Sequence, residues 1–177
     1  LDNSIVSENT VAVVIGNLST TDPDAGDTHT YSVSDTRFEV VAGQLKLKAG
    51  QSLNFETEPS VTLTVIATDA GGLSRSQAFT ITVTNVNETP TAISLDNSTV
   101  AENAVAAVIG TLSTTDPDAG DTHTYTVDDA RFEVVAGQLK LKAGQSLNFE
   151  TEPSVTLTVT ATDAGGLSRS QAYTITV

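Results

Sequence analysis

The chain has 177 residues, of which 22 are acidic and 8 are basic, and its formal net charge is −14. A polyanion of this kind repels nucleic acid, so the charge excludes that partner and favours cations. The sequence has no cysteine, which excludes disulfides and thiolate metal sites, and it has neither an apolar run of about 18 residues nor a signal peptide.

The sequence contains two copies of one unit. When it is shifted by 94 positions, residues 1–83 align with residues 95–177 and 73 of the 83 positions are identical. Each copy is about long enough for a β-sandwich to close its own core. We therefore predict two domains, residues 1–86 and 87–177, with a linker over about residues 84–94. The chain starts and stops at matching points of the repeat, which suggests a piece of a longer array.

Short runs of β-branched residues indicate strands throughout each copy. In the first copy they lie, in chain order, near Ile5 and over residues 11–18, 29–33, 38–48, 61–69 and 77–84. The run over 38–48 is predicted to be a hairpin, with Ala42-Gly43 as its turn. About seven strands in each copy, with no helical periodicity, predict an all-β protein with two seven-stranded Greek-key sandwiches arranged end to end.

The segment over residues 61–69 shows which face of a strand is buried. Val61, Leu63 and Val65 alternate with polar residues, so they are expected to point into the core. Ile66 lies on the opposite face and becomes Thr160 in the second copy. This polar replacement is easier on the solvent side, which supports the assignment.

Most acidic residues lie in loops at the ends of the predicted sandwiches. In the first copy and the linker these loops are Ser-Glu-Asn at 7–9, Asp-Pro-Asp-Ala-Gly-Asp at 22–27, Asn-Phe-Glu-Thr-Glu at 54–58, Ala-Thr-Asp-Ala-Gly-Gly at 67–72 and Asn-Val-Asn-Glu-Thr-Pro at 85–90. Clustered carboxylates repel one another, and their usual uses are a solvated anionic face, catalysis or a hard-cation site.

Two of these uses fit poorly. A solvated acidic surface explains the charge but not the spacing of the acids. Catalysis is disfavoured because only 5% of the residues are aromatic and the whole pattern is duplicated, so we expect no enzyme. His29 and His123 lie in alternating strand sequence, where a surface or partly buried side chain is the ordinary outcome.

Calcium suits the remaining use, because it binds six to eight carboxylate, amide and backbone oxygens with tolerant geometry. An EF-hand is excluded, since position five of its loop falls on Gly26, and the sequence has no glycine-rich nonapeptide repeat. A calcium site would therefore be assembled from several loops.

The succession "SEN … TTDPDAGD … FEVVAGQLKL … LNFETEPSVTLTVIATDAGGLS … VTNVNETP" resembles a cadherin repeat, particularly the bacterial cadherin-like type, and it occurs twice. In that family each repeat is a seven-stranded sandwich. Calcium binds between consecutive repeats, held by the base of one repeat, the linker and the top of the next.

The resemblance implies a ligand set at the joint of the two copies. Ser7 replaces the proline of the family's Pro-Glu-Asn element, and Asn54 replaces the aspartate of its Leu-Asp-Arg-Glu element. The linker motif is one residue shorter before Pro90. The implied ligands are Glu8, Asn54, Glu56, Asn85, Asn87, Glu88, Asp116, Asp118 and Asp163, with Asp121 completing the shell. Unpaired half-sites at the ends are Asp22, Asp24 and Asp69 in the first copy and Glu102, Asn148 and Glu150 in the second.

Six carboxylates at the joint would be neutralised by about three divalent ions, and the neutral Asn54 and Asn85 predict weaker binding than a fully acidic site. The resemblance implies an extracellular or cell-surface adhesin, associated with a membrane, in which calcium at the joint makes the array rigid. Neighbouring repeats are the expected partners, together with another cell-surface protein or a polysaccharide. Two alternatives remain open, namely a polysaccharide-binding module of a secreted protein and a passive acidic spacer.

Overall fold

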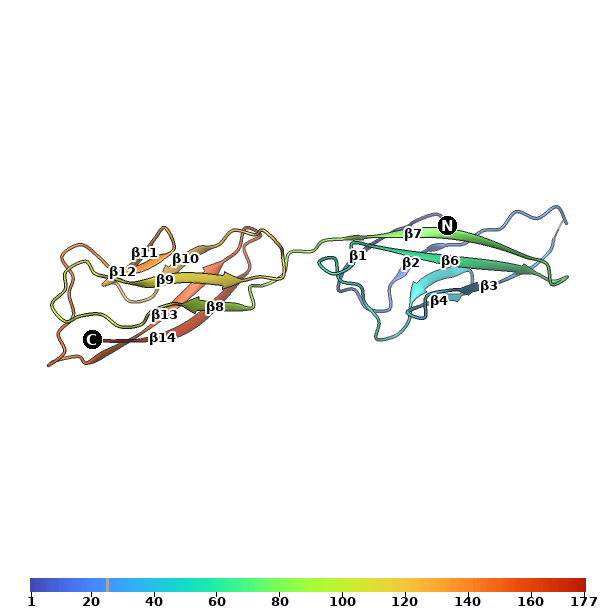
Figure 1. The fold of residues 1–177 in the computed structure, drawn as a ribbon. Coiled ribbons are helices and arrows are strands. Elements are labelled where there is room, and N and C mark those ends of the chain that lie inside the picture. Colours follow the sequence, from blue (N-terminus) through green and yellow to red (C-terminus); the bar gives the residue numbers. More distant parts are fainter. Residues whose placement is uncertain (25) are drawn as a thin grey trace. The chain divides into compact units, whose positions relative to one another are not determined.

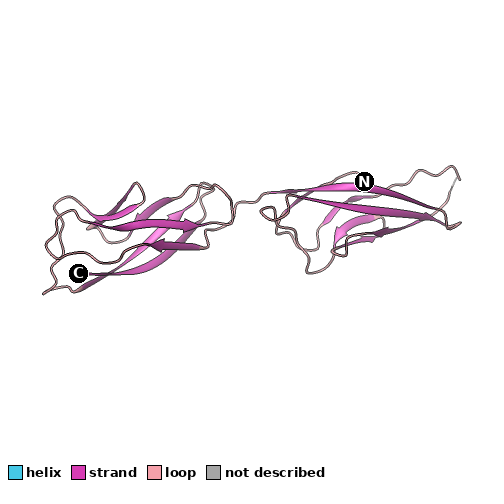
Figure 2. Cartoon of the chain, in the orientation of Figure 1, coloured by secondary structure: helices cyan, strands magenta, loops and turns pink. Residues whose placement is uncertain are grey.

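The structure, a computed structural model, describes residues 1–24 and 26–177. The chain forms two compact units, Leu1–Val86 and Asn87–Val177. The described residues form fourteen strands and no helix, seven strands in each unit, so the predicted all-β class is confirmed (Figure 2). Nowhere in this part of the chain is there a helix long and apolar enough to cross a membrane.

The first unit is a sandwich of two sheets, coloured from blue to green in Figure 1. Its strands are β1 (Ile5–Ser7), β2 (Val14–Asn17), β3 (His29–Val33), β4 (Phe38–Val41), β5 (Gln44–Leu47), β6 (Ser60–Asp69) and β7 (Ser74–Thr84). One sheet has the order β1-β7-β6-β3 and the other β2-β5-β4. Strand β1 runs parallel to β7, whereas β6 pairs antiparallel with both of its neighbours.

The second unit repeats this plan with one change at its first strand. Its strands are β8 (Ala92–Leu95), β9 (Val108–Thr115), β10 (Thr124–Val127), β11 (Phe132–Val135), β12 (Gln138–Leu141), β13 (Ser154–Thr162) and β14 (Ser168–Thr176). The sheets have the orders β10-β13-β14 and β11-β12-β9-β8. The segment that enters this unit first forms β8, which pairs with β9. It then forms an isolated bridge between Thr99 and Thr176 of β14. The entering segment therefore contributes to both sheets.

Two strand boundaries differ from the sequence prediction. Strand β2 covers residues 14–17 rather than 11–18, because Ala12 has a positive φ of 54° and Val11 is 60% exposed. Strand β7 begins at Ser74, three residues before the predicted start, and forms a long antiparallel pair with β6. The alternation of residue types indicated that these strands exist, whereas backbone conformation and pairing with neighbouring strands determined where they end.

Each unit buries its own apolar core. In β6, Val61, Leu63 and Val65 are between 1% and 4% exposed, whereas Ile66 is 39% exposed. The predicted inward and outward faces of this strand are therefore confirmed. Each fully buried side chain of this size contributes roughly 1.5–3 kcal/mol to stability, so each unit is stabilised by a core of its own.

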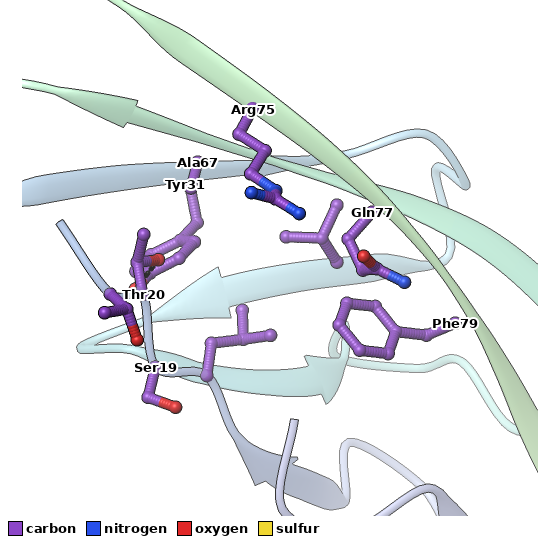
Figure 3. Close-up of a pocket in the computed structure, with 10 residues that line it drawn as sticks. Ser19, Thr20, Tyr31, Ala67, Arg75, Gln77 and Phe79 are labelled. Atoms are coloured by element: carbon purple, nitrogen blue, oxygen red, sulfur yellow. Dashed lines mark hydrogen bonds between the residues drawn. The ribbon is translucent and has the colours of Figure 1, made fainter.

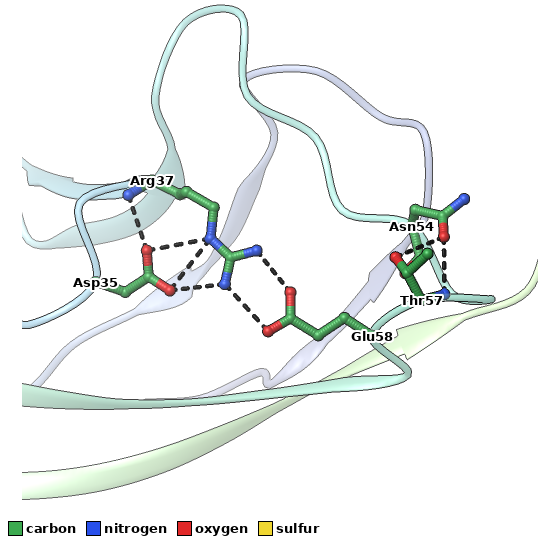
Figure 4. A network of polar contacts seen from close by, with 5 residues as sticks. All are labelled: Asp35, Arg37, Asn54, Thr57 and Glu58. Atoms are coloured by element: carbon green, nitrogen blue, oxygen red, sulfur yellow. Dashed lines mark hydrogen bonds and ion pairs between the residues drawn. The ribbon is translucent and has the colours of Figure 1, made fainter.

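An ion-pair network holds the loop before β6 in place (Figure 4). The Arg37 guanidinium donates hydrogen bonds to Asp35 at 2.7 Å and to Glu58 at 2.6 Å. The hydrogen bonds from Arg37 lower the pKa of the Asp35 carboxyl below its usual value, so this carboxyl stays charged. Glu58 is thus a structural member of the acidic loop that also carries Glu56.

The β4–β5 hairpin has the predicted turn. Val41 pairs with Gln44, and the two residues between them have positive φ, 51° at Ala42 and 78° at Gly43. Two positive φ values define a type I′ turn, whose twist matches that of the strands. Glycine adopts this conformation freely, but in alanine the Cβ atom makes it unfavourable by about 1–2 kcal/mol. The same strain recurs at Ala136, where φ is 50°.

We predict that the double substitution Ala42→Asn and Ala136→Asn stabilises the protein. Asparagine tolerates the left-handed conformation and is preferred at the first position of a type I′ turn. The expected gain is about 1 kcal/mol in each unit, which raises the midpoint of thermal unfolding by about 4–8 °C. Circular dichroism measures this midpoint.

The matched control is Ala78→Asn with Ala172→Asn, which introduces the same residue at exposed strand positions without positive φ. Asparagine is disfavoured in strands, so the control is expected to leave the midpoint unchanged or lower it. Equal shifts in both proteins would contradict the strain assigned to the turn.

Candidate metal centre

Glu8 is the most buried acid of the first unit. It follows β1 directly and is 1% exposed. Its Oε2 accepts a hydrogen bond from the Phe55 backbone N–H at 2.9 Å, and its Oε1 accepts one from the Val86 N–H at 2.8 Å. An ionised carboxylate has about four lone-pair sites, so these two bonds leave capacity for a cation.

Glu56 lies beside Glu8. One carboxylate oxygen of each residue lies within 4.8 Å of the other. Two oxygens that bind the same calcium ion at about 2.4 Å are at most about 4.8 Å apart, so this pair meets the distance requirement for a shared ion.

Asn54, from the same loop, is used differently (Figure 4). Its side-chain oxygen accepts hydrogen bonds from the Thr57 N–H at 2.9 Å and from the Thr57 hydroxyl at 2.8 Å. An amide oxygen has two lone pairs, and both are engaged within the loop. In this geometry Asn54 stabilises the loop that carries Glu56, and its role as a ligand stays a prediction.

Three aspartates meet at one end of the second unit. Asp116 follows β9, Asp163 follows β13, and Asp121 lies in the loop before β10. One carboxylate oxygen from each lies within 4.8 Å of the others. The loops that follow two strands of opposite sheets therefore bring together acids that are far apart in sequence.

Asp118 lies in the same loop as Asp116 but outside that group of three. It is 8% exposed, and its Oδ2 accepts a hydrogen bond from the Glu88 backbone N–H at 2.6 Å. Its Oδ1 is buried and has no hydrogen-bond donor among the described residues. A buried carboxylate oxygen without a donor is uncommon in folded proteins, and a bound cation would satisfy it.

Asn87 connects the linker to the aspartates of the second unit. Its side-chain amide donates to Asp163 Oδ2 at 3.1 Å, and the Leu167 N–H donates to Asp163 Oδ1 at 2.8 Å. Burial raises the pKa of Asp163, but the hydrogen bonds from Asn87 and from backbone amides outweigh it, so the pKa is lowered overall. Asp163 is therefore negatively charged at neutral pH.

The linker is thus held by acids at both of its ends. Val86 belongs to the first unit and donates to Glu8, while Asn87 and Glu88 belong to the second unit and donate to Asp163 and Asp118. Asn85 is exposed. The same carboxylates that are candidate ligands also fix the backbone of residues 86–88.

At the other end of the first unit, the acids that lie close together are not all the ones predicted for the half-site. One oxygen each from Asp22, Asp27 and Asp69 lies within 4.8 Å of the others. Asp24 lies outside this group, and its N–H donates to Asp22 Oδ1 at 2.9 Å. The sequence interpretation omitted Asp27, although it named Asp121, the equivalent residue of the second copy. Comparison of the two copies could have identified Asp27.

The half-site predicted at the far end of the second unit is open to solvent. Glu102, Asn148 and Glu150 are all exposed, and none of them belongs to a group of three or more acids close enough to hold an ion among the described residues. Glu102 is the copy of the buried Glu8. The difference follows from the neighbours of Glu8, which include the donor from Val86.

A histidine contacts each aspartate group, which the sequence interpretation did not anticipate. His123 Nε2 lies 2.8 Å from Asp116 Oδ2, and His29 Nε2 lies 3.1 Å from Asp22 Oδ2. The seven-residue spacing from aspartate to histidine, present in both copies, was the available signal. Each imidazole orients one aspartate of its group.

Comparison with known proteins relates this chain to cadherins. It is 33% identical over 157 residues to Protein dachsous of Drosophila melanogaster, a match that covers 78% of the chain and 4% of that relative. No protein-family model matches. The chain thus spans about 4% of the length of the curated relative that it matches.

Solved cadherin structures share the fold. Repeats 1 and 2 of human protocadherin-24 superpose with a TM-score of 0.78 at 21% identity, covering 98% of this chain and 92% of theirs. The chain has the fold of two cadherin extracellular repeats. Protocadherin gamma B7 repeats 1–4 match with a TM-score of 0.71 at 24% identity, over 99% of this chain and 48% of theirs.

The shared fold and the sequence match to dachsous both support a relationship of this chain to the cadherin superfamily. The matched domains are extracellular cadherin repeats and not enzymes, in agreement with the extracellular or cell-surface location and the absence of enzymatic activity expected from the sequence.

A substitution at Gly165 would selectively disturb the hydrogen bond between Asn87 and Asp163. A Cβ atom added at Gly165 would collide with the Asn87 side chain, whereas one added at the equivalent Gly71 meets only Asp69 Oδ1, at 3.3 Å. Gly165 does not have a positive φ, so alanine is compatible with its backbone.

We predict that Gly165→Ala displaces Asn87 from Asp163 and loosens residues 87–88. Hydrogen exchange at the Glu88 amide, which is bonded to Asp118, is expected to accelerate at least about tenfold. Amide exchange followed by NMR measures this rate, and Gly71→Ala is the control, with no change expected at Glu88. Unchanged exchange in Gly165→Ala would show that Asn87 does not anchor the linker.

Proposed function

We propose that the chain is a calcium-binding pair of cadherin-like repeats from an extracellular or cell-surface adhesin. In this proposal calcium binds where the two repeats join, using acids of the first unit, the linker and the second unit. The ligands proposed are Glu8, Glu56, Glu88, Asp116, Asp118, Asp121, Asp163 and Asn87, with Asn54 and Asn85 in secondary roles.

The observation that carries the proposal is the linker itself. Glu8 accepts the N–H of Val86, and Asp118 accepts the N–H of Glu88, only two residues further along the chain. The acids of both units are therefore attached to one short stretch of backbone. The buried Oδ1 of Asp118, which lacks a donor among the described residues, supports a cation at that position.

The charge of the acids supports the same conclusion. Each carboxylate group of the two units adds to the repulsion within a chain of net charge −14. Calcium would supply charge of the opposite sign and take oxygen ligands, which are the kind present. Extracellular modules bind calcium with dissociation constants of about 10⁻⁴–10⁻³ M, so the site would fill outside the cell.

The adhesin would be a repeated surface protein of the bacterial type, for which the near identity of the two copies is the supporting observation. Its proposed partners are neighbouring repeats and another cell-surface protein. Polysaccharide binding is the less favoured alternative, because sugar-stacking platforms need several exposed aromatic rings. The chain has no tryptophan, its three tyrosines are only partly exposed, and among the described aromatic residues Phe149 alone is exposed.

Calcium binding is tested by calorimetric titration of the whole chain. The double variant Glu56→Gln with Asp116→Asn removes one charge from each side of the linker with little change in shape. We expect saturable binding by the unchanged chain and an affinity at least about tenfold lower in the variant, since ligand charge sets calcium affinity.

The repeat provides a matched control, Glu150→Gln with Asp22→Asn, which makes the same changes at the equivalent positions away from the linker. This variant is expected to keep the tightest binding step. If both variants lose affinity equally, the linker is not the principal site. No binding up to about 10 mM, far above the usual range, would leave the passive acidic spacer as the function.

Calcium is also expected to restrict how the two repeats move. An ion that needs ligands from both units binds only when they are assembled, so it favours that arrangement over all others. Small-angle X-ray scattering with calcium and with chelator is expected to show a narrower distribution of distances with calcium. Identical scattering curves would rule out the rigidifying role, while binding itself is judged separately by calorimetry.

A further inference from the structure

The loop that carries Glu56, a proposed calcium ligand, is a single turn. The Glu58 N–H donates to the Asn54 carbonyl at 3.0 Å, which closes one helical turn that does not continue into a helix. One such turn is too short to be stable by itself, because it fixes several dihedral angles for one hydrogen bond. The position of Glu56 therefore depends on the contacts that hold residues 54–58 to the rest of the first unit.

Two contacts of the backbone hold the ends of this turn. At its start the Phe55 N–H donates to the buried Glu8 carboxylate at 2.9 Å. After its end the Pro59 carbonyl accepts the Val83 N–H at 3.0 Å, next to the paired strands β6 and β7. A segment held at two points can still turn about the line that joins them. A contact away from that line restricts its orientation.

Arg37 supplies such a contact from the loop before β4 (Figure 4). Its Nη1 donates to Glu58 Oε2 at 2.6 Å and its Nη2 donates to Glu58 Oε1 at 3.2 Å, so both carboxylate oxygens are bound. A planar guanidinium that binds a carboxylate through two hydrogen bonds fixes direction as well as distance. Arg37 therefore orients the end of the turn, two residues after Glu56.

Arg37 is itself fixed to the core of the first unit. Asp35 accepts hydrogen bonds from its Nη2 at 2.7 Å and from its backbone N–H at 2.9 Å. The guanidinium carbon lies 5.9 Å from the centre of the Phe38 ring, and Phe38 is 1% exposed. A flexible exposed ion pair contributes little, but an arginine already held in place loses less side-chain entropy when it binds. A continuous set of contacts therefore links the buried Phe38 to the turn that carries Glu56.

The second unit contains the same network away from the linker. Arg131 donates to Asp129 at 2.7 Å and to Glu152 at 2.6 Å. The turn beside it carries Glu150, which is exposed, as is Glu102. Arg131 is therefore a matched position, at which the same contacts can be removed without altering residues 54–58.

Arg75 provides a second comparison, within the first unit. It lines a groove together with Tyr31 and Gln77 (Figure 3). Its side chain is exposed and forms no ion pair with any described residue. Substitution of Arg75 by a neutral residue therefore changes the charge of this unit as much as substitution of Arg37, but it breaks no ion pair.

We propose that Arg37 is a positioning residue for calcium binding, which holds residues 54–58 so that the Glu56 carboxylate stays close to that of Glu8. This inference rests on the proposed function, since it concerns the ligands of that same site. One oxygen of Glu56 and one of Glu8 lie within 4.8 Å of each other. Like charges this close repel, so an unrestrained turn would move Glu56 away from Glu8. Arg37 opposes this movement and keeps both ligands arranged for one ion.

Two effects of Arg37 on calcium affinity have opposite signs. Its positive charge repels a cation, so its removal, which changes the net charge from −14 to −15, favours binding. Its contact with the turn makes the site rigid, and calcium affinity depends on site rigidity as well as on ligand charge. We expect rigidity to dominate, because the Arg37 charge is already paired with Asp35 and Glu58. The sign of the change in affinity therefore distinguishes positioning from charge.

Calorimetric titration of the whole chain with calcium tests the proposal. Arg37→Gln is expected to weaken the tightest binding step by about three- to tenfold, through loss of site rigidity. Arg37→Lys, which keeps the charge but lacks the planar fork, is expected to weaken the same step. Arg75→Gln is the charge control and is expected to leave the affinity unchanged or slightly higher. Equal affinities of Arg37→Gln and Arg75→Gln would overturn the proposal.

Amide hydrogen exchange in the presence of a chelator tests the same role without metal. Exchange of the Phe55 amide, which is bonded to Glu8, is expected to be at least about tenfold faster in Arg37→Gln than in the unchanged chain. Arg131→Gln removes the same contacts from the second unit and is the control for a general loss of stability, with no change expected at Phe55. Unchanged exchange at Phe55 in Arg37→Gln would show that the network does not hold the turn and would also overturn the proposal.

The calorimetric result separates this proposal from the proposed function. If the unchanged chain binds no calcium, both are wrong. If Arg37→Gln binds calcium as tightly as the unchanged chain does, the calcium-binding function stands and only the role assigned to Arg37 is wrong.

Discussion

Repulsion between carboxylates that lie within a few ångströms of one another is the constraint on which the rest of this structure depends. Asp116, Asp121 and Asp163 form one such group, and the structure offsets their charge only in part. His123 contacts Asp116, and Asn87 with backbone amides lowers the pKa of Asp163. Hydrogen bonds of this kind stabilise the charged form but do not neutralise it, so the group stays electrostatically suited to a cation.

Two further acids hold the linker by hydrogen bonds to its backbone. Glu8 and Asp118 each use one oxygen to accept a backbone N–H from residues 86 and 88. A change in the charge of these acids, by metal binding or by substitution, would therefore act directly on the backbone between the repeats. This coupling would be the physical basis of the proposed calcium effect, and it needs no change inside either apolar core.

The duplication allows each feature to be compared with a nearly identical copy in another context. Glu8 is buried and Glu102 is exposed, although the two occupy the same position of the repeat. Leu18 is partly buried and Leu112 is almost fully buried, since only the latter has β8 beside it. In both cases the compared residue is the same, and the neighbouring segment of chain decides its environment. The linker is that neighbour each time, first through Val86 and then through β8.

The sequence by itself determined the features that depend on local spacing. Alternation along residues 61–69 predicted the buried face of β6, the Ala42-Gly43 step predicted the hairpin turn, and the 94-residue shift predicted two equivalent β-sandwiches. The acids could be assigned to loops for the same reason, because they interrupt the alternation.

Only the tertiary structure decided which groups meet across loops and sheets. It placed Asp27 rather than Asp24 with Asp22 and Asp69, and it engaged Asn54 with Thr57. It also divided the entering segment of the second unit between two sheets. These outcomes depend on contacts between residues far apart in sequence, or on which of several donors within one loop is used. Residue spacing alone predicts neither.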